Sequence, residues 1–266
     1  MSLDKLFVSK REFLAISAIF VEACARRPGR VIRPEYTAQD FFESFPEGLS
    51  SGIIRKYPVD NPAQCLVHIK MIHGGRFIPE DKKQMVDQVQ HDIYQIVKSL
   101  IRRYGIRDIR HEGFYEEGNL TRQAVKHYKE MTRIAGNHYQ YYAGAIPKLA
   151  YEGEVSVKKG DDKIIMDGII ERRNHDPYSK YDGRENALLD VIAKEGDTVN
   201  ILIYGGWHAF AGTSRLTEDI TGVISTQNNI ATFNSMFPDK KIAFIEVVPS
   251  AYLQYIGFFN NPDISR

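Results

Sequence analysis

Cys65-Leu-Val-His-Ile-Lys-Met-Ile72 is the stretch that decides the fold class, because a short apolar run with β-branched residues is typical of a buried strand. His73-Gly74-Gly75 ends it, and residues 79–104 then repeat apolar side chains at helical spacings. Ile106-Arg-Asp-Ile-Arg-His111 predicts a second strand, ended by Glu112-Gly113. A strand, a long helix and a strand form a βαβ unit, which predicts a parallel strand pair with a right-handed crossover.

The last third of the chain repeats this pattern. A helix is predicted from Arg184 to about Glu195, and the strand Val199-Asn-Ile-Leu-Ile-Tyr204 ends at Gly205-Gly206-Trp207-His208. A helical stretch over about 216–236 leads into the strand Ile242-Ala-Phe-Ile-Glu-Val-Val248. We therefore expect an α/β fold with a central mixed, largely parallel β-sheet flanked by helices. The repeated pattern also allows a fold made of two related βα halves.

The remaining segments are less regular. A helix capped by Asn119 is expected over 120–142. Residues 154–158 and 163–166 flank a turn, which indicates either a hairpin or a strand followed by a helix. Five prolines interrupt residues 26–62, so we predict an N-terminal helix and an irregular covering segment over 1–62, with a single α/β domain over 63–266.

Charge and hydropathy narrow the function classes. The 266 residues carry 35 Lys+Arg and 34 Asp+Glu, a formal net charge of +1, so no nucleic-acid partner is expected and a small-molecule or peptide substrate is favoured. No stretch reaches the roughly 20 apolar residues that span a bilayer. We expect a cytoplasmic protein, or an exported one if residues 1–24 act as a leader rather than as an amphipathic helix. The oligomeric state is left open.

Two histidines follow predicted strands beside glycine pairs, namely His73 and His208. Glu112 ends the strand between them in the chain, and in open α/β sheets ligands bind at the carboxyl ends of strands. Two His and a Glu are a plausible ligand set for zinc, manganese or cobalt. Without a metal, the same residues could act as general base and acid. The alternative is structural, because a single His at the end of a strand is commonly a hydrogen-bonded structural residue.

Arg184 and the tyrosines of residues 139–142 are further candidates. An Arg at a helix N-terminus opposes the helix dipole, which favours a local role such as pairing with Glu112 or binding an anionic group. Tyr139, Tyr141 and Tyr142 could ligate haem iron or form an aromatic wall, and packing is the commoner explanation.

These motifs resemble a known superfamily. Val67-His-Ile-Lys-Met-Ile-His73-Gly74 and Ile109-Arg-His-Glu112-Gly113 resemble the opening strands of the group that joins Tiki-type metalloproteases, TraB/PrgY-type proteins, erythromycin-esterase-like proteins and ChaN-like haem-binding proteins. Arg184-Glu185-Asn186 and Ile201-Leu-Ile-Tyr-Gly205-Gly-Trp-His208-Ala209 resemble its late motifs. The resemblance covers about residues 65–113 and 184–212.

The resemblance implies that His73, Glu112, Arg184 and His208 converge. The leading hypothesis is a metal-dependent hydrolase of peptide, ester or amide bonds, with His73, Glu112 and His208 as metal ligands or activators of water and Arg184 orienting Glu112 or stabilising an oxyanion. The alternatives are a haem- or iron-binding protein of ChaN-like type and a non-catalytic domain of the same fold. One departure from the Tiki-like pattern is Lys70, which stands where that pattern has Gly and could disfavour a divalent metal or point away.

Overall fold

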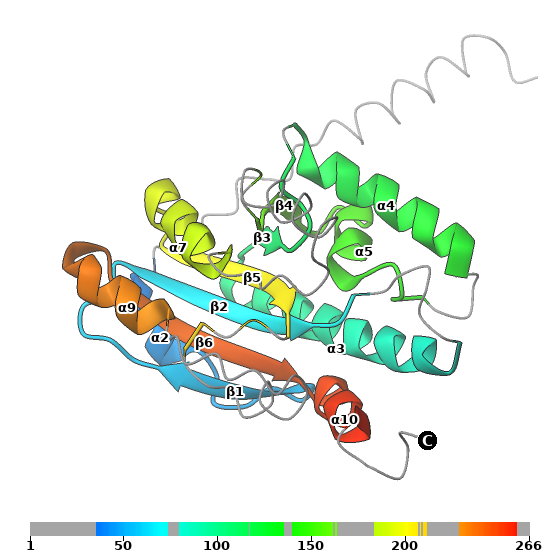
Figure 1. Ribbon diagram of the computed structural model, residues 1–266, viewed down its shortest axis with the longest axis horizontal. Helices are drawn as coiled ribbons and strands as arrows, with labels where there is room; N and C mark the ends of the chain where they lie inside the picture. Colours follow the sequence, from blue (N-terminus) through cyan, green and yellow to red (C-terminus); the bar gives the residue numbers. More distant parts are fainter. Residues whose placement is uncertain are drawn as a thin grey trace, which may run out of the picture. The chain divides into compact units, whose positions relative to one another are not determined.

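The computed structural model describes residues 36–73, 80–116, 118–135, 140–161, 163, 184–206, 208, 210–211 and 229–259. The predicted N-terminal helix, Trp207 and most of the predicted helix 216–236 lie outside these residues. The described part is an α/β fold, as predicted, built on a six-stranded sheet of order β1-β6-β2-β5-β3-β4 (Figure 1). No helix in this part of the chain has both the length and the apolar character needed to cross a membrane.

Five of the six strands run parallel. They are β2 (Gln64–Met71), β3 (Asp108–His111), β4 (Ser156–Lys159), β5 (Val199–Gly205) and β6 (Ile242–Pro249). The sixth strand, β1 (Gly52–Tyr57), pairs antiparallel with β6 at one edge. All residues of β2 and β6 are buried, which fits central strands covered on both faces.

The strand order corrects one prediction. β2 and β3 are parallel, but they are not neighbours, because β5 lies between them. In the same way β2 lies between β5 and β6, the two strands of the later unit. The two predicted units are therefore interleaved, and the carboxyl ends of β2 and β5 lie side by side, with Met71 paired to Gly205.

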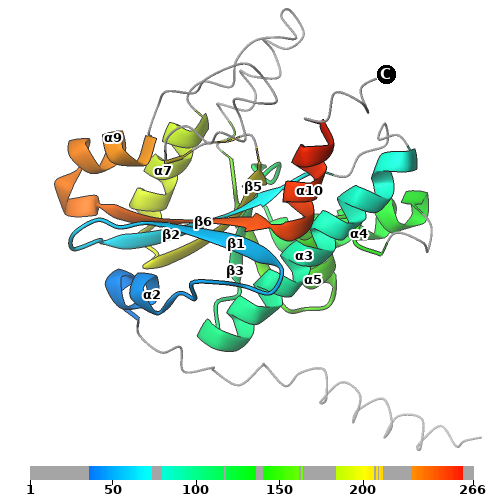
Figure 2. The same ribbon diagram turned by 90° about the horizontal axis from the view of Figure 1, so that it is seen from below.

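Helices cover both faces of the sheet. Figure 2 shows α7 (Arg184–Glu195) and α9 (Asn229–Met236) on one side of it, and α2 (Ala38–Ser44) and α3 (Glu80–Tyr104) on the other. The helix α5 (Ala145–Tyr151) packs against α3, and both contribute to the largest of three hydrophobic clusters among the described residues. Alternate residues of β2 fill the two larger clusters, since Val67 and Ile69 face α3 while Leu66 packs with α7.

Four other segments differ from prediction. Within 26–62, α2 and β1 are regular elements, so the expected irregular segment is wrong there; the six residues of β1 lie between Pro46 and Pro58, which hides them in the sequence. The helix α4 (Leu120–Ala135) ends before Tyr142, although Asn119 caps it as predicted by accepting from Arg122 N. β4 pairs parallel with β3, so residues 156–159 are not one arm of a hairpin. The helix α10 (Ser250–Phe259) was not predicted.

Candidate active site

Three parallel strands bring the predicted site residues to one edge of the sheet. His73 lies two residues beyond β2, Glu112 directly follows β3, and His208 lies three residues beyond β5. His73 Nε2 lies 3.0 Å from Glu112 Oε2, and His208 Nε2 lies 3.7 Å from Glu112 Oε1. The carboxylate of Glu112 therefore contacts both imidazoles, His73 through Oε2 and His208 through Oε1.

Two more donors complete the surroundings of Glu112. Arg184 Nη2 donates to Oε1 at 2.9 Å, and the backbone N–H of Gly205 donates to Oε2. Burial opposes ionisation of this carboxyl, but hydrogen bonds from His208 and His73 outweigh it and hold the pKa of Glu112 well below its usual range. Glu112 is therefore a carboxylate at neutral pH, and both of its oxygens accept hydrogen bonds.

His208 is held from its other ring nitrogen. Nδ1 lies 2.6 Å from Glu185 Oε1, and the imidazole lies against the ring of Tyr204, with centroids 4.3 Å apart. Burial lowers the pKa of His208, but hydrogen bonds to Glu112 and Glu185 outweigh this and raise it above its ordinary value. The two carboxylates thus favour the imidazolium form.

Asp161 is a site residue that the sequence did not reveal. Its Oδ1 accepts from Arg184 Nε at 2.9 Å and Nη2 at 2.7 Å and from the Tyr204 hydroxyl at 2.6 Å, while Oδ2 accepts from Gly113 N at 2.8 Å. It thereby fixes the guanidinium that contacts Glu112 and the backbone that follows Glu112. Its place just beyond a parallel strand was the available signal, but that segment was expected to form a turn of a hairpin.

Close backbone approach explains two glycines at this edge. A Cβ on Gly160 would lie 2.3 Å from the carbonyl carbon of His111, and a Cβ on Gly205 would lie 2.9 Å from Glu112 Oε2. Real Cβ atoms do not approach other atoms so closely. The glycines therefore let β4 and β5 lie directly against the segment that carries Glu112.

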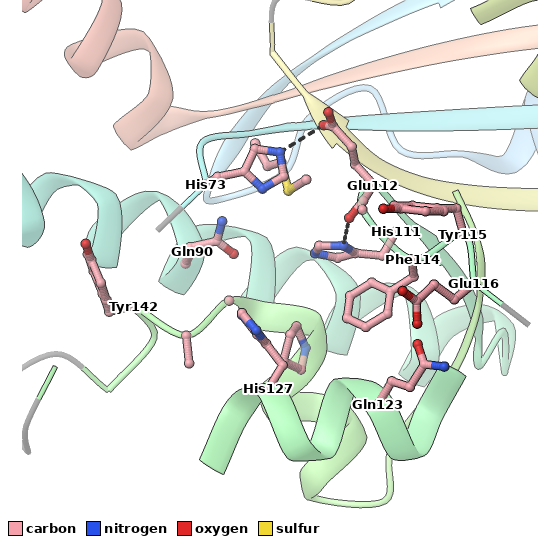
Figure 3. Close-up of a pocket in the computed structure, with 15 residues that line it drawn as sticks. His73, Gln90, His111, Glu112, Phe114, Tyr115, Glu116, Gln123, His127 and Tyr142 are labelled. Atoms are coloured by element: carbon pink, nitrogen blue, oxygen red, sulfur yellow. Dashed lines mark hydrogen bonds and ion pairs between the residues drawn. The ribbon is translucent and has the colours of Figure 1, made fainter. Parts of the chain in front are cut away.

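A cavity of about 340 Å³ opens beside this carboxylate on the α3 face (Figure 3). Among the side chains that face it are His73, His111, His127 and Glu112. The side chain of His73 is 51% exposed, whereas those of Glu112 and His208 are 11% and 12% exposed. Neither Arg184 nor His208 lines the cavity, so both lie behind Glu112 as seen from it.

His111 and His127 extend the candidate site beyond the residues predicted from the sequence. His111 Nδ1 lies 2.6 Å from the carbonyl oxygen of Glu112, which can only accept, so this nitrogen carries the proton. Burial lowers the pKa of His111 to about 4, so its imidazole is neutral at pH 7. Its Nε2 is then a hydrogen-bond acceptor, and Figure 3 shows it on the side of the ring that faces the cavity.

Lys70 does not contact Glu112. Its fully buried ammonium pairs with Glu246 Oε1 at 3.1 Å and donates to the carbonyl oxygen of Gly206 at 3.1 Å. Arg55 Nη1 contacts the other oxygen of Glu246 at 3.0 Å. The sequence left open whether Lys70 disfavours a divalent metal or points away from the site. The structure shows that it points away from the Glu112 carboxylate, and its bond to Gly206 supports the turn after β5.

The predicted metal ligands do not form a metal site with the residues that the structure describes. Within those residues no group of three or more His, Cys, Asp or Glu side chains could hold a metal ion. A guanidinium and a backbone N–H already occupy the Glu112 oxygens that a metal would need, so the donor set does not fit a divalent cation.

The tyrosine segment divides into different environments. Tyr139 lies outside the described residues. Tyr141 packs against His91 and Tyr94, with ring centroids 4.8 and 5.2 Å apart, so it contributes to a surface cluster. Tyr142 is buried and lines the cavity, as expected for an aromatic wall.

Glu112, Arg184, His73 and His208 are thus brought together as the resemblance implied, and Asp161, Glu185 and His111 join them. Comparison of the chain with protein-family models, with curated proteins and with solved structures found no match.

Proposed function

We propose that this protein is a hydrolase of ester, amide or peptide bonds that uses His73 as its general base. One observation carries the proposal: an exposed imidazole and the ionised carboxylate of Glu112 lie 3.0 Å apart at the wall of a cavity. Such a pair is the usual way to orient a histidine and to stabilise its protonated form. The cavity volume lies at the lower end of the range for small-molecule sites, which supports a small substrate or a single side chain of a peptide.

The tautomer of His73 follows from its contact. A carboxylate only accepts, so the Nε2 that faces Glu112 carries the proton and leaves the lone pair on Nδ1. Figure 3 shows this second nitrogen turned toward the cavity. Nδ1 takes a proton from water while the water oxygen bonds to the carbonyl carbon. When the tetrahedral intermediate collapses, the bond to the leaving group breaks and the imidazolium returns the proton to that group.

Glu112 stabilises the imidazolium that forms during this step. Arg184 and His208 are positioning residues, because they hold the Glu112 carboxylate ionised and fixed from the side away from the cavity. Asp161 is a positioning residue one step further back, because it fixes the Arg184 guanidinium. The geometry supports the first of the two roles considered for Arg184, since its guanidinium is buried on Glu112 and Asp161. No step of this mechanism passes through a metal.

Hydrolysis of a panel of chromogenic esters and anilides tests the proposal. The wild-type chain is expected to hydrolyse at least one of them, and His73→Ala to lose that activity, while His91→Ala, a change of the same kind outside the cavity, retains it. Absence of activity across the panel would favour the non-catalytic alternative. Loss of activity on chelation, restored by stoichiometric zinc, manganese or cobalt, would support the metal-dependent form of the hypothesis instead.

The haem-binding alternative is tested on the same protein. Haem titration that yields a Soret band at one equivalent, lost in Tyr142→Phe or His73→Ala, would favour it. The cavity provides less support for this alternative, because a volume of about 340 Å³ suits a small ligand better than a macrocycle.

A further inference from the structure

We infer that the cavity beside Glu112 recognises an organic ammonium group, so that the preferred substrate is a small ester or amide that also carries an amine. The inference rests on the proposed function for the bond that reacts, but the binding of the amine stands on separate observations. These are the hydrogen-bonding character of the wall, its aromatic rings and its charge.

Several polar groups that reach the cavity are acceptors, beside the Gln123 amide and the Tyr115 and Tyr142 hydroxyls, which can both donate and accept. His111 donates from Nδ1 to the backbone, which leaves Nε2 as an acceptor on the cavity side. Gln90 offers little, because its Nε2 donates to Ile72 O at 2.6 Å and its Oε1 accepts from Ala145 N at 2.8 Å. The carboxylate of Glu116 can only accept. A ligand that fits these groups brings hydrogen-bond donors.

Aromatic rings form much of the remaining wall. Phe114, Tyr115 and Tyr142 line the cavity, and Phe114 meets the ring of His111 edge-on with centroids 5.2 Å apart. The faces of aromatic rings attract organic cations, most strongly where water is partly excluded. The same rings provide no comparable attraction for a carboxylate or a phosphate.

The charge of the cavity wall also favours an ammonium group. The fifteen lining residues, all of them described, include two glutamates and neither lysine nor arginine. Glu112 is balanced by Arg184 and the two histidines, which leaves the exposed Glu116 as the carboxylate available to a ligand. Figure 3 shows His73 and Glu116 at different ends of the cavity. The reacting bond would therefore lie at His73 and the ammonium toward Glu116.

Three probes of similar size and different charge test this inference without any reaction. Benzylammonium, benzyl alcohol and benzoate are titrated into the 266-residue chain at pH 7, and the dissociation constants are measured by ligand-observed NMR. Benzylammonium is expected to bind roughly tenfold more tightly than benzyl alcohol, from a cation–π contact and one charge-assisted hydrogen bond. Benzoate is expected to bind most weakly.

Glu116→Gln should reduce the preference for benzylammonium over benzyl alcohol by about fivefold, because it removes the charge and keeps the shape. Glu43→Gln, the same change on the exposed side of α2, should leave the preference unchanged. Equal binding of the three probes, or tightest binding of benzoate, overturns the inference even if esters are hydrolysed. Selective binding of benzylammonium without any hydrolysis sustains the ammonium site and counts against the proposed reaction.

Discussion

His73 and His208 look equivalent in the sequence, since each follows a buried strand beside glycines, but the structure gives them different surroundings. The imidazole of His73 is 51% exposed and faces a cavity, whereas that of His208 is 12% exposed and lies between two carboxylates. Both contact Glu112 from opposite sides. Under the proposed function, His73 is the imidazole that exchanges protons with the substrate, while the two carboxylates around His208 favour its protonated form.

The largest expected effect comes from removing the exposed imidazole. His73→Ala should lower kcat/KM by about 10³-fold, within the range for loss of a general base, and should hardly change the free energy of unfolding because the side chain is half exposed. Steady-state kinetics and urea unfolding measure the two quantities. If His73→Ala keeps most of its activity, His73 is not the general base, and the proposed difference in role between His73 and His208 is wrong.

The second largest effect is expected on the free energy of unfolding, and it comes from Arg184, which is buried behind Glu112. Arg184→Met leaves the carboxylates of Glu112 and Asp161 without their shared cation, so the free energy of unfolding should fall by about 3–5 kcal/mol. Arg122→Met, on the exposed side of α4, is the matched control and should change it by less than about 0.5 kcal/mol. A small effect of Arg184→Met would show that the ion pairs of Arg184 with Glu112 and Asp161 do not stabilise the fold.

The elements that the sequence predicted are those with strong local patterns. β2 and β6 are mostly apolar runs because they are buried on both faces, and the 25 residues of α3 repeat apolar side chains over many turns. β1 was missed because it is a six-residue edge strand with alternating exposure. The insertion of β5 between β2 and β3 was also missed, since strand order depends on long-range pairing that no local period records.

The same limit applies to the site. His73, Glu112 and His208 could be predicted because each lies just beyond a recognisable strand, and the carboxyl ends of parallel strands meet at one edge. Asp161 could not, because its role requires β4 to pair parallel with β3. The different exposure of the two histidines was equally hidden, since it depends on which helices pack against each face of the sheet.

A smaller effect is expected from Lys70, which lies on β2, the strand that precedes His73, but pairs away from the site. Lys70→Met should change kcat/KM by less than about threefold, because its ammonium contacts Glu246 and Gly206 rather than Glu112. The free energy of unfolding should fall by about 1–3 kcal/mol, the cost of a lost buried hydrogen bond, with Arg55 still neutralising Glu246. A large rise in metal binding in this variant would instead support the interpretation that Lys70 disfavours a divalent cation.

The smallest effect concerns the charge on His208. Carboxylates of Glu112 and Glu185 raise its pKa in the folded chain against the effect of burial, while Arg184 and the ring of Tyr204 also face it. A raised folded-state pKa contributes stability that is complete below the ordinary histidine value and is lost as the pH rises through the folded value. The free energy of unfolding of the wild-type chain should therefore fall by this contribution as the pH rises from the ordinary histidine pKa through the raised folded-state value.

Glu185→Gln tests that assignment, because the amide keeps an acceptor for Nδ1 and removes the charge. The pKa of His208, followed by NMR of its imidazole, should move down, and the free energy of unfolding at pH 6 should fall by about 1 kcal/mol or less. Asp190→Asn makes the same charge change on the exposed side of α7 and should shift neither quantity appreciably. If the pKa of His208 does not change in Glu185→Gln, the contact at 2.6 Å does not set its protonation, and the electrostatic difference between the two histidines loses its support.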